Sequence, residues 1–405
     1  MESDETGWTS LLPLAADNST LTPTAAGPAT VWQRYPGMQA LMYEFRPAVY
    51  YMRLLLPLVW ILFGLPGNLL SFIVWTKSKL RSSSGYYLAA GALSDVMNQL
   101  LRMPHAVKRF SGVSVYDRPG VCQLGAVFFN MCQYNHTLLI GAFTFERYQV
   151  ITHPFKRAHL CRRKRALKTI ACLVALSLAT STIHGYFWYC QPPYGCTLRA
   201  DVTKGGQSSL FSIWSWITEL LFFGLLPILV LILNMSVIGS IRRSRSVRMR
   251  YLQHYHGAQA DAEPSSDEPS TTRRTVTALT LLTLSFYTIA MELPVTVLYC
   301  LSTAFPAGDV TASDEELTSD AQWRRFLDYW TLRYSVENIA ASHYAATFYL
   351  SYVTSSAFRR ETRRLCAART CRRRAAAETS SQQKSQSRTQ SLPLNTLARP
   401  DATKL

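Results

Sequence analysis

The sequence predicts an all-α protein, a bundle of seven helices that cross a membrane. Four blocks of 21 to 25 residues contain no Asp, Glu, Lys or Arg, at residues 54–76, 121–145, 169–189 and 220–241. Each block exceeds the roughly 18–20 residues that a helix needs to cross the hydrocarbon core of a bilayer. Three further apolar segments, at residues 82–107, 276–301 and 327–353, are interrupted by charged or polar groups, and the last of them gives the weakest signal.

The distribution of basic residues predicts the orientation of the chain. The segment 147–168 holds eight Lys or Arg and no acid, and residues 355–374 hold eight basic residues and one Glu. On the opposite side, residues 304–328 hold six acids and two Arg. Basic loops stay in the cytoplasm, so the N-terminus is expected outside and the C-terminus inside. The net charge of +17 then follows from topology. No basic soluble module is visible, and we expect no nucleic-acid partner.

The termini differ in composition from the spans. Residues 1–30 are acidic at their start and rich in Pro, Thr and Ala, which predicts a disordered outer tail. They show neither the basic region nor the apolar core of a signal peptide. Asn18 begins a glycosylation sequon there. The expected domains are an extracellular tail at 1–49, the seven-span bundle at 50–354, an amphipathic helix 8 at 355–366 and a disordered cytoplasmic tail at 367–405.

Several polar and helix-bending residues fall inside the spans. The triplet Glu146-Arg147-Tyr148 closes the third span, and charged groups at a membrane edge are costly enough to indicate a function. Neighbouring helices can satisfy the carbonyl that a proline frees, so prolines give a membrane bundle local hinges. The prolines in spans 2, 5 and 6 are Pro104, Pro227 and Pro294, and the buried polar candidates are Asn68 and Asp95.

With these residues at these spacings, the chain resembles the rhodopsin-like (class A) G-protein-coupled receptors over about residues 50–366. The stretches 67–75, 87–95, 142–148 and 161–166 are similar to invertebrate neuropeptide receptors of the FMRFamide type and related orphans. The resemblance implies a plasma-membrane receptor for an extracellular peptide that couples to heterotrimeric G proteins. It implies no cofactor and no enzymatic activity.

Two family motifs are altered. The Cys-Trp-x-Pro of helix 6 reads Met291-Glu292-Leu293-Pro294 here, and the Asn-Pro-x-x-Tyr of helix 7 begins with Thr347 and ends with Ser351. These changes leave the predicted fold in place and alter the expected activation switch.

The resemblance assigns G-protein coupling to the triplet and to two residues beyond it. Arg147 is expected to rest against Glu146 and to face the G protein once helix 6 moves outward. The alternative is that Arg147 only anchors the chain at the inner membrane face. The further coupling candidates are Tyr148, Pro154 and Phe155. Phe155 is expected to enter an apolar slot on the G protein, or alternatively to face lipid.

Charged residues inside the other spans are the candidates for ligand binding. We expect a pocket lined by Arg102, Phe129, Gln133, Tyr134, Glu219, Glu292, Tyr299, Arg333 and Glu337. The alternative for the charged members is an internal ion pair between helices. Phe129 stands where amine receptors of the family carry Asp, which argues against an amine ligand. The acidic segment 304–328 would either steer a cationic peptide or form a solvated loop.

An inner polar site is also expected from the resemblance. In this family the residue at the place of Asp95 helps to hold a sodium ion. The surrounding places hold His136, Glu292, His343 and Thr347 here. No metal is assigned by sequence motif. The hypothesis is that a proton or a transition metal replaces sodium, and the alternative is a static network of neutral histidines.

The cysteines and the tail suggest covalent and partner sites. Cys122 is expected to pair with Cys190 or Cys196, since all three lie near the oxidising face. Cys366 and Cys371 follow the last span and are candidates for palmitoylation. The Ser/Thr-rich tail suits receptor kinases and arrestin, and Thr403-Lys404-Leu405 matches a PDZ ligand.

Two other classes of protein remain as alternatives. A transporter or channel would show inverted repeats, and none is visible. An intramembrane enzyme would carry a motif such as His-Glu-x-x-His or Gly-x-Ser-x-Gly, and neither occurs. A divergent receptor for a non-peptide ligand stays open as well.

Overall fold

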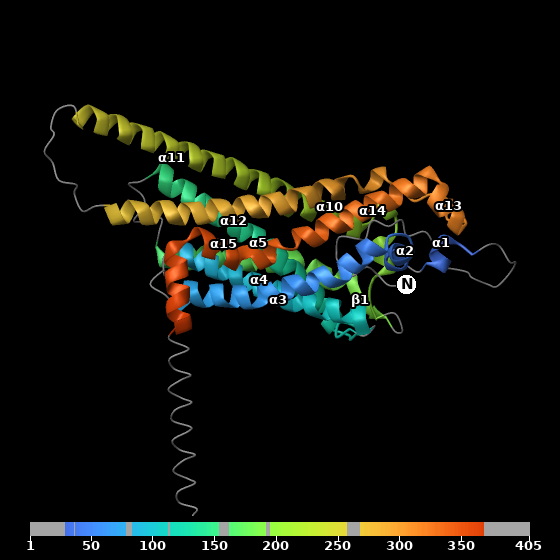
Figure 1. Cartoon of the computed structure of the whole chain (residues 1–405). Coiled ribbons are helices and arrows are strands. Elements are labelled where there is room, and N and C mark those ends of the chain that lie inside the picture. The colour runs from blue at the N-terminus through green and yellow to red at the C-terminus, as the bar shows by residue number, and fades with distance from the viewer. Residues whose placement is uncertain are drawn as a thin grey trace, which may run out of the picture.

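The computed structural model describes residues 29–35, 37–77, 83–111, 114–153, 162–191, 195–256 and 268–367. Long helices run side by side along one axis (Figure 1), and all seven predicted spans are helical, so the predicted fold class is confirmed. The spans are α3 (Pro47–Lys77), α4 (Ser83–Ser111), α5 (Val121–Thr152), α7 (Arg163–Ser181) with α8 (Ile183–Phe187), α10 (Leu210–Thr218) with α11 (Leu226–His256), α12 (Glu268–Cys300), and α14 (Ala321–Ala340) with α15 (His343–Thr354).

The two ends of the bundle are distinguished by residues of α5. Cys122 lies at the first turn of α5 and Arg147 at the last turns. We call these the disulfide end and the triplet end.

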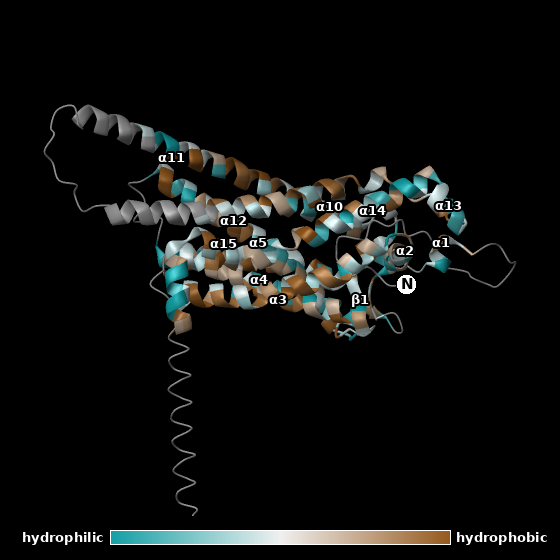
Figure 2. Ribbon diagram, in the orientation of Figure 1, coloured by the Kyte–Doolittle hydropathy of each residue, from teal (hydrophilic) through white to brown (hydrophobic). Residues whose placement is uncertain are grey.

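Apolar and polar side chains divide between the outside and the inside of the bundle. Within the described residues, four helices are long and apolar enough to cross a membrane by length and composition: Pro47–Thr76, Arg163–Phe187, Leu210–Arg243 and Leu282–Ala304. In Figure 2, brown apolar ribbon is clear on α3 and on the part of α11 that adjoins α10. The more polar spans α4, α5 and α14–α15 turn polar groups inward, including Asp95, Asn98, Gln133, His136, Arg333 and His343. Polar groups that face the interior are typical of a multi-pass membrane protein.

The fifth span contains a π-helical segment at Glu219–Leu225, between α10 and α11. Pro227 follows it and carries no N–H, so the carbonyl of Phe223 four residues earlier loses its helical donor. The hydroxyl of Thr296 on α12 donates to that carbonyl at 3.0 Å. The irregular backbone is therefore satisfied by a neighbouring helix, as membrane interiors require.

The seventh span is broken, which corrects the expectation of one continuous segment at 327–353. α14 ends at Ala340 and α15 begins at His343. The ring of His343 caps the break, because its Nδ1 donates to the carbonyl of Ala340 at 2.6 Å. The amides of Asn68 and Gln99 donate to the carbonyl of Tyr344 at 2.6 Å and 3.0 Å. Side chains from α3, α4 and α15 thus stabilise the break.

A folded cap covers the disulfide end. It consists of α1 (Val31–Arg34), α2 (Gly37–Phe45), α13 (Asp314–Ser319) and the first turns of α14, with the fully buried Trp323 in its core. The indole N–H of Trp323 donates to the carbonyl of Asp309 at 3.0 Å. The residues of α1 and α2, expected within a tail, are therefore helical and packed.

The acids of the cap have structural partners. The carboxylate of Asp320 accepts from the backbone N–H groups of Gln322 and Trp323 at 2.8 Å each and so caps α14. The backbone N–H of Thr311 donates to Asp309 and holds the pKa of that carboxyl below its usual range. The segment is more ordered than a solvated loop. Its steering role stays a prediction.

Trp323→Ala is expected to loosen the cap, because truncating a fully buried Trp removes its packing and costs roughly 3–5 kcal/mol. Hydrogen exchange of the amides of α1 and α2 should accelerate accordingly. Arg325→Ala, an exposed neighbour, is the matched control and should leave the exchange rates nearly unchanged. Equal exchange in the two variants would contradict the packing argument.

At the triplet end, a helix at residues 356–367 runs across the bundle (Figure 1), in agreement with the predicted helix 8. Its fully buried Phe358 packs against Trp75 of α3 and Phe348 of α15, with ring centroids 5.1 Å and 5.8 Å apart. This contact joins helix 8 to the first and seventh spans.

Candidate functional site

A disulfide joins Cys122 to Cys196, with the two Cα atoms 5.5 Å apart. Cys196 lies on β2 (Gly195–Leu198), which pairs antiparallel with β1 (Trp188–Gln191) in a hairpin that the sequence did not predict. Cys190 stands directly opposite Cys196 in this hairpin and is free. Of the two partners left open by the sequence, the structure selects Cys196.

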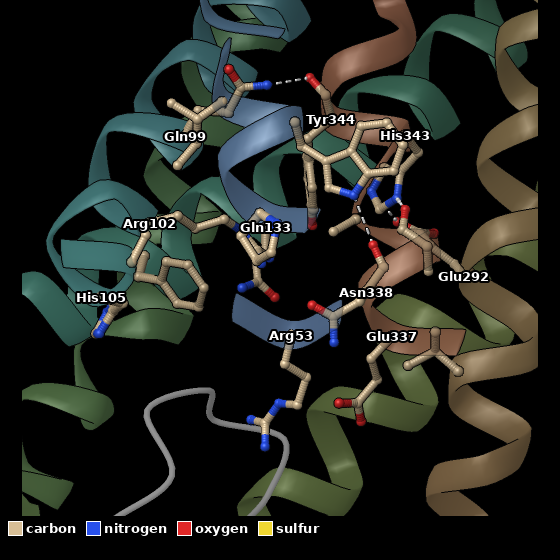
Figure 3. A pocket seen from close by; sticks show the side chains of 18 of the residues that line it. Arg53, Gln99, Arg102, His105, Gln133, Glu292, Glu337, Asn338, His343 and Tyr344 are labelled. Carbon is tan, nitrogen blue, oxygen red and sulfur yellow. Dashed lines mark hydrogen bonds and ion pairs between the residues drawn. The ribbon is translucent and has the colours of Figure 1, made fainter. Parts of the chain in front are cut away.

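A cavity lies between the helices towards the disulfide end (Figure 3). Its lining comes from spans 1, 2, 3, 5, 6 and 7 and carries charges of both signs. The basic side chains Arg53, Arg102 and Arg109 belong to α3 and α4. The acidic side chains Glu219, Glu292 and Glu337 belong to the fifth, sixth and seventh spans. The cavity is therefore bipolar, with a basic and an acidic side.

Six of the nine predicted pocket residues line this cavity: Arg102, Phe129, Gln133, Glu219, Glu292 and Glu337. The guanidinium of Arg102 donates to the side-chain oxygen of Asn98 at 2.8 Å and lies 5.1 Å from the ring centroid of Phe129. On the opposite wall, the Thr296 hydroxyl that contacts the Phe223 carbonyl also lies 2.9 Å from a carboxylate oxygen of Glu219. These neighbours orient the charged groups at the cavity.

The other three predicted pocket residues, Tyr134, Tyr299 and Arg333, lie outside the lining. Tyr134 faces the fourth and fifth spans, stacks on Phe222 at 4.4 Å and contacts His184 Nε2 at 3.1 Å through its hydroxyl. Tyr299 packs edge-on against a tryptophan of α10. Arg333 is almost fully buried and donates to Glu337 at 2.8 Å. It therefore orients a lining carboxylate from behind.

Sequence reasoning missed several lining residues, of which Arg53, His105, Arg109, Asn338 and Tyr344 are examples. Arg53 was overlooked because it precedes the first uncharged block, whereas α3 begins at Pro47 and places it two turns inside the helix. The charge pattern of the sequence contains a signal that could have identified two of them. Arg53 and Arg109 are basic residues on the side where the charge bias predicts few of them.

The triplet forms a buried network at its end of the bundle. Arg147 Nη2 lies 3.5 Å from Glu146 Oε1, so the predicted pair is close in space. The hydroxyl of Ser83 on α4 lies 2.7 Å and 2.8 Å from the two oxygens of Glu146 and donates to this carboxylate. Tyr148 lies one residue beyond on α5.

Several predicted residues lie outside the described residues: Asn18, Pro154, Phe155, Cys371 and Thr403-Lys404-Leu405. Cys366 lies on the helix at 356–367 and is exposed. Its palmitoylation stays a prediction.

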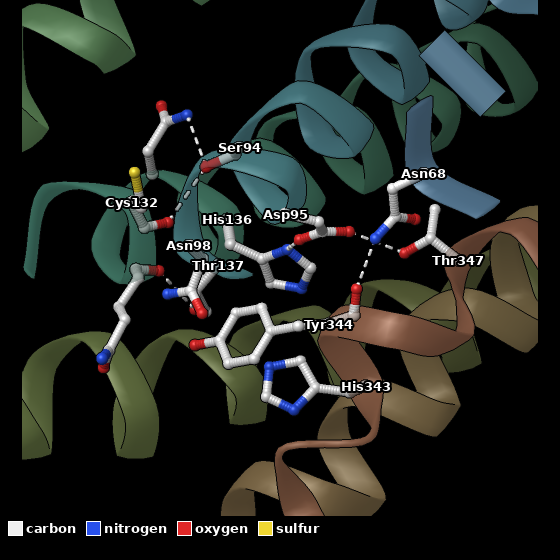
Figure 4. A network of polar contacts seen from close by, with 12 residues as sticks. Asn68, Ser94, Asp95, Asn98, Cys132, His136, Thr137, His343, Tyr344 and Thr347 are labelled. Carbon is white, nitrogen blue, oxygen red and sulfur yellow. Dashed lines mark hydrogen bonds and ion pairs between the residues drawn. The ribbon is translucent and has the colours of Figure 1, made fainter. Parts of the chain in front are cut away.

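Four residues of the predicted inner polar site, Asp95, His136, His343 and Thr347, lie together in the centre of the bundle (Figure 4). The fifth, Glu292, lies beside His343 (Figure 3). His136 Nδ1 is 2.6 Å from Asp95 Oδ1, and the hydroxyl of Thr347 donates to Asp95 Oδ2 at 2.8 Å. His343 Nε2 lies 3.6 Å from Glu292 Oε1, which in turn accepts from the Thr137 hydroxyl at 3.2 Å. The rings of His136 and His343 are 5.2 Å apart between centroids, so the two pairs are adjacent.

The fold, the triplet and the disulfide together define a seven-helix membrane receptor. Residues 67–336 match the family described as 7 transmembrane receptor (rhodopsin family). This match covers well over half of the chain, and the chain belongs to that family.

Curated relatives share shorter stretches with the chain. Neuromedin-U receptor 2 of Mus musculus is 30% identical over 146 residues, which are 35% of this chain and 37% of that receptor. Neurotensin receptor type 1 of Homo sapiens is 31% identical over 116 residues, 27% and 28% of the two chains. Alpha-1A adrenergic receptor of Cavia porcellus is 29% identical over 156 residues, 38% and 33%. The matched stretches span only about a third of these receptors.

Proposed function

We propose that this chain is a plasma-membrane receptor that binds an extracellular peptide at the disulfide end and activates a heterotrimeric G protein at the triplet end. The bipolar cavity carries the proposal. A peptide presents a carboxylate, terminal or on a side chain, and basic groups on the same molecule. The arginines of α3 and α4 would bind the carboxylate. Glu219, Glu292 and Glu337 would bind the basic groups.

The chemistry of the cavity favours a peptide over a small amine. The side chain at the amine-binding place on the third span is Phe129, which offers no carboxylate. Two of the relatives named above are neuropeptide receptors, and this supports a peptide more than the adrenergic relative supports an amine.

The proposal places the N-terminus and the disulfide end outside the cell and the triplet end in the cytoplasm. This orientation agrees with the basic segment after Arg147, and with a disulfide in the oxidising compartment. In the same proposal, receptor kinases and arrestin act on the tail after residue 367. Asn18 carries glycan, Cys366 and Cys371 carry palmitate, and the C-terminal Thr403–Leu405 binds a PDZ protein.

A screen of amidated and free-acid peptides on cells that express the chain tests the proposal. Calcium and cyclic nucleotide levels are the readouts, and untransfected cells are the control. A peptide that evokes a G-protein response only in expressing cells supports the assignment. Ion currents or substrate flux without nucleotide exchange on any G protein would instead favour a channel or a transporter.

Arg102→Gln is expected to weaken the response to the identified peptide. A hydrogen bond to a charged group contributes about 1.5–3 kcal/mol, so its loss predicts a potency decrease of about 10- to 100-fold. Arg324→Gln removes the same charge from the exposed surface of α14 and should leave potency unchanged. If the two variants have the same potency, Arg102 does not contact the ligand.

A further inference from the structure

Three buried ligand atoms face one another between α5, α12 and α15. They are one ring nitrogen each from His136 and His343 and one carboxylate oxygen of Glu292, and all three lie within 4.8 Å of one another. The three residues are 4%, 4% and 6% exposed. His136 Nε2, His343 Nε2 and Glu292 Oε2 have no hydrogen-bond partner in the structure. Unpartnered polar atoms in a membrane interior are costly, and three of them at one point call for a common partner.

Hydrogen bonds fix the tautomers of the two histidines. His136 Nδ1 lies 2.6 Å from a carboxylate oxygen of Asp95, and His343 Nδ1 lies 2.6 Å from the carbonyl oxygen of Ala340. Both oxygens accept, so in each ring Nδ1 carries the hydrogen. In the neutral rings, each Nε2 therefore presents a lone pair towards the other ring and towards Glu292. The three unpartnered atoms of the cluster are therefore all acceptors.

We propose that this cluster is a binding site for a zinc ion, with His136 Nε2, His343 Nε2 and the Glu292 carboxylate as ligands. Two imidazoles and a carboxylate are an established zinc ligand set, with bonds of about 2.0–2.2 Å. Ligands of a tetrahedral zinc ion then stand about 3.4 Å apart. His343 Nε2 and Glu292 Oε1 are already 3.6 Å apart, and a side-chain adjustment of His136 closes the site.

The surroundings suit a divalent cation. Asp95 accepts from the Nδ1–H of the ligand His136, which is the carboxylate–histidine arrangement that orients zinc ligands. Asp95 and Glu292 together balance a charge of two. Among the described residues, the cationic partners within 4 Å of these carboxylates are only His136 and His343. Glu292 and His343 also line the large cavity, which gives the ion a route in and leaves the fourth position to water.

The ligand atoms distinguish this site from a sodium site centred on Asp95. Both oxygens of Asp95 already accept hydrogen bonds, from His136 and from Thr347. The proposed ion instead contacts two nitrogens, which bind transition metals and zinc in preference to hard cations. A bound zinc ion joins the third, sixth and seventh spans and stabilises their present arrangement. This site goes beyond the proposed function. Zinc binding there requires neither the peptide nor the G protein, and the site shares Glu292 with the lining of the proposed peptide cavity.

Thermal unfolding of the purified full-length chain in detergent, with and without zinc chloride, tests the site. Zinc at a hundredfold of its Kd should raise the Tm by roughly 5–10 °C, with one zinc ion bound per chain. Magnesium and sodium at the same ionic strength should not reproduce the shift. Zinc X-ray absorption should show two imidazoles and otherwise oxygen in the first coordination shell. Failure to bind zinc, or a bound zinc ion without two imidazoles, would overturn the proposal.

Matched variants separate this cluster from zinc bound elsewhere on the chain. Glu292→Gln keeps the shape of the side chain and an acceptor for Thr137, and should reduce zinc affinity by at least tenfold. His136→Asn with His343→Asn should abolish the shift in Tm. His184→Asn removes a buried histidine that contacts Tyr134 away from the cluster, and should retain the shift. A shift that persists in Glu292→Gln and in the double variant would assign the zinc to another site. If the double variant does not fold, Glu292→Gln and the absorption spectrum of the unaltered chain still decide.

Discussion

Replacing Arg147 by alanine is expected to abolish agonist-driven nucleotide exchange on the G protein and to leave the amount of receptor at the cell surface near normal. In the structure, Arg147 lies 3.5 Å from Glu146 and is 19% exposed at its side chain. Removal of one partner of a buried ion pair normally leaves an uncompensated charge. Here the hydroxyl of Ser83 still donates to the Glu146 carboxylate, so the variant keeps a partner for the remaining charge. Folding should therefore survive the loss of the guanidinium.

The measurement is agonist-driven GTPγS binding in membranes, normalised to surface receptor. Arg165→Ala is the matched control, because it removes an exposed basic residue at the same end of the bundle, on α7. It should leave nucleotide exchange within about twofold of the unaltered receptor, as expected for a surface substitution. An Arg147→Ala variant with full exchange would exclude coupling through this residue.

The sequence predicted the spans well because they follow from local signals, and the resemblance to the receptor family correctly predicted that the residues of the inner polar site lie close together. An uncharged block of more than 20 residues has few structures open to it other than a membrane helix. Within a helix bundle, the family spacing then brings distant residues such as His136, Glu292 and His343 to the same depth. The structure places these three side chains within reach of one another.

The cap and the cavity wall were harder to predict because tertiary contacts determine them. The residues of α1 and α2 precede the first uncharged block and form no apolar run of span length, yet they become helical by packing on Trp323 nearly 300 positions later. The break at Ala341–Ser342 contains neither Pro nor Gly, and depends on donors from α3 and α4. Arg333 belonged to the predicted pocket by its charge, but its pairing with Glu337 could not be separated from ligand contact before the helices were placed.

Cys122→Ser is expected to cause a large loss of stability and of correctly folded receptor. The disulfide closes a loop with a sequence separation of 74 residues, and a loop of that length predicts a stabilisation of about 4 kcal/mol. The bond also holds the β1–β2 hairpin on α5, where Cys122 is buried against Phe187 and Trp188. Thermal unfolding in detergent and the amount of surface receptor measure the effect.

The free thiol of Cys190 provides the control and also a complication. Cys190→Ser should leave the Tm within about 2 °C, because that sulfur takes no part in the bond and only contacts the carbonyl of Asp117. In a Cys196→Ser variant, however, Cys190 lies directly opposite the lost sulfur in the hairpin and is the nearest replacement partner for Cys122. The variant Cys196→Ser should therefore lose less stability than Cys122→Ser, and adding Cys190→Ser should remove the difference. If Cys190→Ser alone destabilised the receptor as strongly as Cys122→Ser, the pairing of Cys122 with Cys196 would be wrong.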